Sequence, residues 1–408
     1  MPFRLSQEAD YLTMERLASD SAQDIRERVV SLLRDLVCID SVSPTMGGPA
    51  GGEARMAEYL GAYCSKLGFD VTYQEALPGR PNVIATLSRG EGLPRLVFEG
   101  HLDTVSAGGM TNPFNATIRG GRIYGRGACD TKGGIASCLL ALERLAALDE
   151  LPLEVEFLGA ADEEIGFQGV LAYLAGATEG GAAVVIEPTS LVPVVAHAGV
   201  LRGSLRSTGV AVHSSIPTLG ENAIDKLVGS LSAVEAWARA RQPNHHELTG
   251  STSFSITTIR GGEAINIIPR ECVAEFDWRL HPTEDPTVAL DDLTSFLRHA
   301  CPAVEVGEVL LQDTGLNTAA NARVVTAAQA ACKSVTGNPS VVGVGWGSDA
   351  SKFARHSGWE AIVLGPGSIA QAHADDEWID LDEVVSASEL YFALALELAT
   401  APTLIETV

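Results

Sequence analysis

Short apolar runs rich in β-branched residues alternate with longer amphipathic stretches in the first half of the chain, and no other feature constrains the fold as strongly. The runs predict strands at residues 83–87, 96–99, 155–159 and 184–186. The amphipathic stretches predict helices at residues 25–36, 53–67 and 135–148. Because strands alternate with helices, we expect an α/β sheet with helices on both faces.

The pattern changes in the middle of the chain. From about Gly199 to about Leu311 it predicts a compact α+β unit, with strands at 201–207, 253–259 and 272–280 and helices at 223–240 and 287–300. A chain of 408 residues also exceeds the length at which one hydrophobic core usually keeps growing. We therefore predict an α/β domain with a mixed sheet, formed by residues 1–198 and 312–408, that is interrupted by a smaller inserted domain at residues 199–311.

Charge and composition exclude several classes of partner and site. Acidic residues outnumber basic ones 52 to 28, and the net charge of −24 disfavours nucleic acid and anionic membrane surfaces. The first twenty residues hold no apolar run long enough for a signal peptide or a membrane span, so we expect a cytoplasmic protein. The 7 cysteines form no CxxC pair, which argues against a disulfide framework and a thiolate metal site.

His101 and Asp103 come at the end of one expected strand. Two residues separated by one project to the same side of an extended chain, so Asp103 can support a metal-bound His101. For this pair alone, the alternative is a surface histidine beside a capping aspartate. Taken by itself, the pair leaves both interpretations open.

Asp130 lies in the glycine-rich run GRGACDTKGG, at residues 125–134. The run lacks the phosphate-loop pattern, so it is not predicted to bind a nucleotide. Its glycines permit a tight backbone that presents Asp130 just before a helix, where a short carboxylate can bridge two cations. A helix N-cap is the alternative.

Further acidic residues and a histidine follow other expected strands. Glu163 and Glu164 come after the strand at 155–159, and since adjacent residues there point in different directions, one can bind metal while the other transfers protons. Glu187 ends the run at 184–186, and His373 follows an expected strand at 361–364. A solvated loop is the alternative for the paired glutamates. Taken together, the five segments predict a metal site.

The sequence resembles the co-catalytic zinc metallopeptidases, a family that includes acetylornithine deacetylase, succinyl-diaminopimelate desuccinylase, aminoacylase and a glutamate-releasing carboxypeptidase. The resemblance covers nearly the whole chain, and the motifs GHLDTV, GRGACDTKGG, DEE, IEPTS, HSS, GGEAINIIP and GPGSIAQAH occur in the family's order. It is strongest toward acetylornithine deacetylase, above all in IEPTSLVPVVAHAG and LGPGSIAQAHADDEW.

The resemblance implies two Zn²⁺ ions, for which Co²⁺ is a possible substitute. One zinc would be held by His101 and Glu187, and the other by Glu164 and His373. Asp130 and a water molecule would bridge the two ions, and zinc lowers the pKa of bound water to about 7.

The resemblance also assigns roles to residues that do not bind metal. Asp103 would lie behind His101, and Glu163 would be the general base that takes a proton from the bridging water and delivers it to the leaving amine. In the inserted domain, which would serve as a lid and a dimerisation domain, His213 would stabilise the oxyanion, often in the partner subunit's site of a homodimer. Asn266 and Arg279 would hold the substrate's carbonyl and carboxylate, with a turn histidine and a strand-face salt bridge as the alternatives for His213 and Arg279.

Two features of the sequence bear on the substrate. Relatives that cleave acyl groups tend to carry glutamate at the position of Glu187, whereas those that cleave peptides tend to carry aspartate. Residues 347–351 lack the arginine that many relatives place after the Asp-Ala pair. We expect zinc-dependent hydrolysis of a small Nα-acyl amino acid, acetylornithine or a near relative. The alternatives are a carboxypeptidase or dipeptidase with the same metals, and a catalytically silent metal-stabilised binding protein, against which Glu163 argues.

Overall fold

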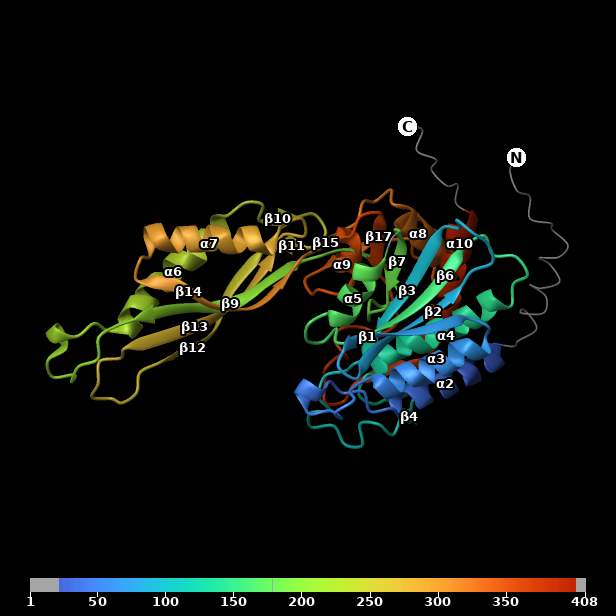
Figure 1. Ribbon diagram of the computed structural model, residues 1–408, viewed down its shortest axis with the longest axis horizontal. Helices are drawn as coiled ribbons and strands as arrows, with labels where there is room; N and C mark the ends of the chain where they lie inside the picture. Colours follow the sequence, from blue (N-terminus) through green and yellow to red (C-terminus); the bar gives the residue numbers. More distant parts are fainter. Residues whose placement is uncertain (1–21, 178, 401–408) are drawn as a thin grey trace. The chain divides into compact units, whose positions relative to one another are not determined.

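The computed structural model describes residues 22–177 and 179–400 (Figure 1). Contacts within the chain divide it into two compact units. The first comprises the described residues up to Val195, Thr318–Val341 and those from Ser348 onward, and the second comprises Ala196–Asn317 with Val342–Gly347. The second unit is wider than the expected inserted domain at 199–311, and its role as a lid or dimerisation domain stays a prediction.

A mixed sheet dominates the first unit, with the strand order β1-β2-β6-β3-β7-β17-β8. The strands are β1 (Asp70–Leu77), β2 (Arg80–Leu87), β3 (Arg95–His101), β6 (Glu154–Ala160), β7 (Gly181–Val185), β8 (Val194–His197) and β17 (Trp359–Val363). β15 (Leu316–Asn317) and β16 (Val342–Val344), which belong to the second unit, pair with β8. β8 runs from the first unit into the second. β6, β3, β7 and β17 are parallel, so their carboxyl ends meet at one edge.

Helices cover both faces of this sheet, as its α/β pattern predicts (Figure 1). They are α2 (Ala22–Val37), α3 (Ala54–Lys66), α4 (Gly133–Ala146), α5 (Gln168–Gly176), α8 (Arg323–Val335), α9 (Ala350–Arg355) and α10 (Leu381–Thr400). α2, α4, α8 and α10 pack with one another, whereas α5 packs with α9. All but the first residue of β3 and of β6 is buried, which explains why these strands are mostly apolar rather than alternating, apart from the buried Glu99 and Glu156.

A small antiparallel sheet and two short helical turns complete the first unit. The sheet has the order β18-β5-β4, from Trp378–Asp380, Arg122–Tyr124 and Thr117–Arg119. The turns are η1 (Pro44–Met46) and η2 (Ala128–Lys132). Since β5 precedes η2 and β18 follows His373, this sheet brings together two segments that are far apart in the sequence.

The second unit is an antiparallel sheet packed against two helices, with the strand order β12-β13-β9-β14. The strands are β9 (Gly199–Thr208), β12 (Ser253–Gly261), β13 (Glu271–Leu280) and β14 (Val304–Asp313). The helices are α6 (Ala223–Ala240) and α7 (Pro286–Ala300). The connections contain the short turn η3 (Pro217–Leu219) and the strand pair β10 (His245–His246) and β11 (Gly250–Ser251). Every second residue of β13 is buried, as expected for a sheet with one covered face.

The N-terminal ends of both helices in the second unit are fixed by side-chain caps. Asn222 accepts hydrogen bonds from the amides of Ile224 and Asp225, and Asp285 accepts one from the amide of Thr287. β14 was not expected from the sequence, because most of its residues are exposed or half-buried and acidic residues interrupt its apolar pattern. None of the helices described is long and apolar enough to cross a membrane.

Candidate metal centre

Four of the five predicted ligands lie at the carboxyl edge of the parallel strands. His101 is the last residue of β3, Glu164 follows β6 and Glu187 follows β7. These three strands are parallel neighbours, so the three side chains reach the same edge of the sheet. His373 lies between β17 and β18, and Asp130 lies in η2 immediately before α4.

The Asp130 carboxylate lies between the two histidines. Its Oδ1 is 2.9 Å from Nε2 of His101, and its Oδ2 is 3.2 Å from Nε2 of His373. Each histidine also faces a glutamate: Glu187 Oε1 is 3.7 Å from His101 Nε2, and Glu164 Oε1 is 3.1 Å from His373 Nε2. The structure thus brings together all five side chains as two histidine and glutamate pairs that share one aspartate.

Two overlapping sets of potential ligand atoms exist at this edge. Atoms of His101, Asp130 and Glu164 all lie within 4.8 Å of one another, and the same holds for His101, Glu163 and Glu187. Imidazole nitrogens and carboxylate oxygens are the donors that Zn²⁺ and Co²⁺ accept. A carboxylate with one oxygen directed toward each histidine also has the arrangement that a ligand shared by two cations needs. The donor set therefore fits a pair of divalent cations.

The electrostatics of the cluster agree with this fit. Burial raises the pKa of Glu187 well above its ordinary value, and the charge of Asp130 raises it further. Hydrogen bonds to Asp130 and Glu164 raise the pKa of His373 to about 10. Burial alone would lower the pKa of His101, but Glu187 and the neighbouring aspartates raise it well above its ordinary value. Because carboxylates are crowded in a buried place, the cluster favours positive charge.

The residue Asp103 contacts both His101 and the turn that carries the two glutamates. Nδ1 of His101 is 2.9 Å from the backbone oxygen of Asp103 and 3.6 Å from its carboxylate. Because a carbonyl oxygen only accepts, Nδ1 carries the proton, and Nε2 is left to face Asp130 and Glu187. The carboxylate of Asp103 accepts hydrogen bonds from the amides of Glu163 (3.1 Å) and Glu164 (3.3 Å).

A buried ion-pair network that sequence reasoning missed supports the same turn. Nη1 of Arg80 lies 2.9 Å from Oδ1 of Asp162, and its Nε and Nη2 donate to Glu53 at 2.9 and 3.0 Å. Glu53 is 0% exposed, Asp162 is 4% exposed, and Asp162 has a left-handed backbone with φ 71°. Such a conformation costs free energy for a residue other than glycine, so the network stabilises the turn just before Glu163.

Two further buried residues that sequence reasoning missed are Arg126 and Glu377. Glu377 ends an acidic run, Asp375-Asp376-Glu377. Only the third of these carboxylates is fully buried, and the sequence of the run does not indicate which one it is. Arg126 forms an ion pair with it at 2.6 Å. The one usable signal was the position of Arg126 between two glycines in the run that carries Asp130.

Three predicted site residues belong to the second unit. His213 and Asn266 lie on adjacent backbone segments, since the amide of Ser214 donates to the carbonyl of Asn266 at 2.9 Å. The side chains of His213 and Asn266 are exposed. Arg279, on β13, donates to the carboxylate of Asp277 at 2.8 Å, which is the strand-face salt bridge considered as its alternative role. The roles of all three toward a substrate stay predictions.

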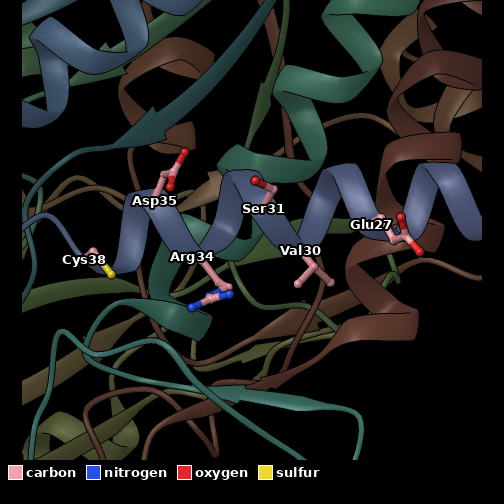
Figure 2. A pocket seen from close by; sticks show the side chains of 6 residues that line it. All are labelled: Glu27, Val30, Ser31, Arg34, Asp35 and Cys38. Atoms are coloured by element: carbon pink, nitrogen blue, oxygen red, sulfur yellow. The ribbon is translucent and has the colours of Figure 1, made fainter.

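A pocket of about 390 Å³ lies on the outer face of α2 (Figure 2). Its lining side chains come from one side of that helix: Glu27, Val30, Ser31, Arg34, Asp35 and Cys38. None of them is a predicted site residue, so this pocket is separate from the chemistry described above.

Comparisons with known proteins agree with the sequence and the geometry. The chain matches the family model "Peptidase family M20/M25/M40" over residues 97–397. It is 31% identical to acetylornithine deacetylase of Myxococcus xanthus, with 86% of this chain and 93% of that protein covered. It is 28% identical to a probable succinyl-diaminopimelate desuccinylase of Staphylococcus aureus (strain MSSA476), with 76% and 84% covered.

Solved structures share the fold. The M20 family metallo-carboxypeptidase Sso-CP2 from Sulfolobus solfataricus has a TM-score of 0.76 at 22% identity, with 91% of this chain and 99% of that chain covered. Aminopeptidase PepT from Bacillus cereus has a TM-score of 0.73 at 25% identity, with 92% and 99% covered. The family resemblance inferred from the motifs is confirmed, and the chain belongs to peptidase family M20/M25/M40 as a metal-dependent amidohydrolase.

Proposed function

We propose that this amidohydrolase cleaves the amide bond of a small Nα-acyl amino acid, in the manner of acetylornithine deacetylase, and releases a carboxylate and a free amino acid. The observation that carries the proposal is the Asp130 carboxylate between His101 and His373, with a further glutamate at each histidine. Relatives named acetylornithine deacetylase and succinyl-diaminopimelate desuccinylase, which align over most of their length, support an acylated amino acid as the substrate.

We further propose that the cluster holds two Zn²⁺ ions, with Co²⁺ as a possible substitute. The proposed ligands are His101, Asp130, Glu164, Glu187 and His373. When bound, such ions lower the pKa of a shared water molecule and polarise the acyl carbonyl. Asp130 would be the shared ligand, because its two oxygens are directed toward different histidines.

Glu163 is the proposed general base. Its carboxylate lies within 4.8 Å of ligand atoms of His101 and Glu187. The neighbouring Glu164, and not Glu163, is paired with His373, which leaves Glu163 available for proton transfer. Burial raises the pKa of Glu163 well above its ordinary value, and the nearby charge of Glu164 adds to this while His101 opposes it. A carboxylate with a raised pKa can accept a proton from the attacking water and then donate it to the leaving amine.

Three of the residues proposed to bind substrate belong to the second unit. We propose that His213 stabilises the developing oxyanion, and that Asn266 and Arg279 bind the substrate's carbonyl and carboxylate. A homodimer formed through this unit is part of the proposal, because β12 lies at the edge of its sheet and the same unit exposes the apolar side chains of Leu219 (71% exposed) and Ile265 (103% exposed). A sedimentation measurement that finds a fully active monomer would contradict it.

A substrate panel tests the proposal. The Zn²⁺-loaded protein is assayed with Nα-acetylornithine, other Nα-acetyl and Nα-succinyl amino acids, and simple dipeptides. We expect kcat/KM to be at least about tenfold higher for one of the acylated amino acids, a difference of about 1.4 kcal/mol in transition-state binding. A preference for dipeptides would instead support a carboxypeptidase or dipeptidase. Bound metal without turnover on any substrate would support a silent binding protein.

A further inference from the structure

The buried carboxylate of Glu377 gathers four hydrogen-bond donors from the loop that carries Asp130. Its Oε1 accepts from the amides of Cys129 at 2.8 Å and Asp130 at 3.1 Å. Its Oε2 accepts from the amide of Gly127 at 3.0 Å and from Nη1 of Arg126 at 2.6 Å. Glu377 is 0% exposed, so its carboxylate binds these donors away from bulk solvent. The loop backbone is therefore fixed around one side chain from a distant part of the sequence.

Arg126 also contacts the segments that carry His101 and His373. Its Nε donates to the carbonyl of Ser106 at 2.9 Å, and its Nη2 donates to the carbonyl of Ala374 at 3.3 Å. Ser106 lies on the segment that begins with His101, and Ala374 directly follows His373. Arg126 is only 2% exposed. Inside the protein, its guanidinium connects the segments that carry His101, Asp130 and His373.

We infer that Arg126 and Glu377 form a positioning pair for the metal centre, which holds Asp130 at the distance from which its carboxylate reaches both His101 and His373. Neither Arg126 nor Glu377 is a proposed ligand. The inference rests on the proposed metal centre, and it adds the residues that set that centre's geometry. Groups that orient metal ligands typically change metal affinity 10- to 100-fold when they are removed.

The backbone of the loop is shaped for this arrangement. Gly127 has φ 79°, in the left-handed region, where a residue with a side chain would be strained. A Cβ atom there would lie 2.7 Å from Cγ2 of Thr104 and 2.9 Å from Cε of Lys132. Glycine therefore allows both the close packing and the direction of the amide that donates to Glu377.

The test is the Glu377→Gln variant, which keeps the size of the side chain but replaces one acceptor oxygen with a donor NH₂. That NH₂ must face either the amides of Cys129 and Asp130 or the amide of Gly127 together with Arg126, so the loop has to move. We measure Co²⁺ binding to the metal-free protein by calorimetry, and the magnetic coupling of the two bound Co²⁺ ions by electron paramagnetic resonance. We expect the second Co²⁺ to bind about 10- to 100-fold more weakly, and the coupling signal to change.

A matched control removes an Arg–Glu pair at the amino ends of β3 and β6, the strands whose carboxyl ends lead to His101 and Glu164. Arg95 begins β3 and pairs with Glu154, which begins β6, at 2.7 Å. The Glu154→Gln variant should keep both Co²⁺ affinities and the coupling signal. If it altered them as strongly as Glu377→Gln, the effect would be a general consequence of losing an ion pair, and the inference would be wrong.

The outcomes separate this inference from the proposed function. If the unaltered protein bound no pair of Co²⁺ ions, the proposed metal centre itself would fail. A different outcome is that the unaltered protein binds two Co²⁺ ions and Glu377→Gln binds both as tightly as the unaltered protein does, with the same coupling signal. In that case only the positioning role would fail. Should Glu377→Gln not fold, the Arg126→Lys variant, which keeps the charge but loses the planar fork, is measured in the same way and judged by the same outcomes.

Discussion

The carboxylate of Asp103 accepts a hydrogen bond from the backbone amide of Glu163, with Oδ1 3.1 Å from the nitrogen. Its other oxygen accepts from the amide of Glu164 at 3.3 Å, and its backbone carbonyl faces Nδ1 of His101. Asp103 thus orients the proposed ligand His101 at the end of β3. It also orients the turn after β6, which carries the proposed base and a second proposed ligand.

The Asp103→Asn variant should lower kcat about 10- to 100-fold. The amide of asparagine offers one acceptor where the carboxylate offers two, so one of the two backbone amides loses its partner and the glutamate turn shifts. Steady-state kinetics and metal content by elemental analysis measure the effect. A variant with unchanged kcat would contradict the orienting role of the Asp103 carboxylate.

The Glu163→Ala variant should retain both metal ions and lose most turnover. General acid–base catalysis contributes about 10²- to 10⁴-fold, and we expect kcat to fall within this range because the proposed ligand set is untouched. Elemental analysis and kinetics on the same sample provide the measurement. Near-normal activity would refute the assignment of Glu163 as the base.

The His373→Ala variant should lose metal affinity as well as rate, because it removes an imidazole that lies 3.2 Å from Asp130 and 3.1 Å from Glu164. Metal content after dialysis and kcat are measured together. His299→Ala, which removes an exposed histidine from α7, serves as the control and should keep both. Unchanged metal content in His373→Ala would remove His373 from the proposed ligands.

The Arg80→Met variant should destabilise the protein by about 3–5 kcal/mol, since it leaves Glu53 and Asp162 as buried carboxylates without their cation. The free energy of unfolding is measured in denaturant. Arg260→Met, which removes an exposed arginine paired with Glu275, is the control and should change stability by less than about 1 kcal/mol. An equally small effect of Arg80→Met would show that the buried network does not stabilise the turn before Glu163.

Removal of the metals should lower thermal stability. Ions that bind only the folded chain stabilise it by about 4 kcal/mol per site when their free concentration is 1,000 times Kd. Here the removal of the ions would also leave the carboxylates around Asp130 without their positive charge, and repulsion among them would destabilise the folded chain further. Calorimetric melting with and without a chelator tests this, and addition of Zn²⁺ or Co²⁺ should restore the original Tm. A Tm unaffected by the chelator would contradict the proposed metal centre.

Local patterns in the sequence were sufficient to predict most of the secondary structure and the candidate ligands. Buried parallel strands such as β3 and β6 are mostly apolar, and polar residues that follow them mark the edge of the sheet. For this reason the sequence alone predicts His101, the pair Glu163 and Glu164, and Glu187 as candidates, whereas the choice of Glu164 as the ligand came from the family resemblance. β14 could not, because its mostly exposed residues leave no clear apolar period.

What only the tertiary structure decided are the contacts between side chains that are far apart in the sequence. Asp130 lies between His101 and His373 because β18 pairs with β5, which brings the segment around His373 beside η2. The same pairing buries Glu377, although nothing in its acidic run distinguishes it from its neighbours. Hydrophobic periodicity is a local property of the chain, whereas the position of a carboxylate among its donors depends on the packing of the whole unit.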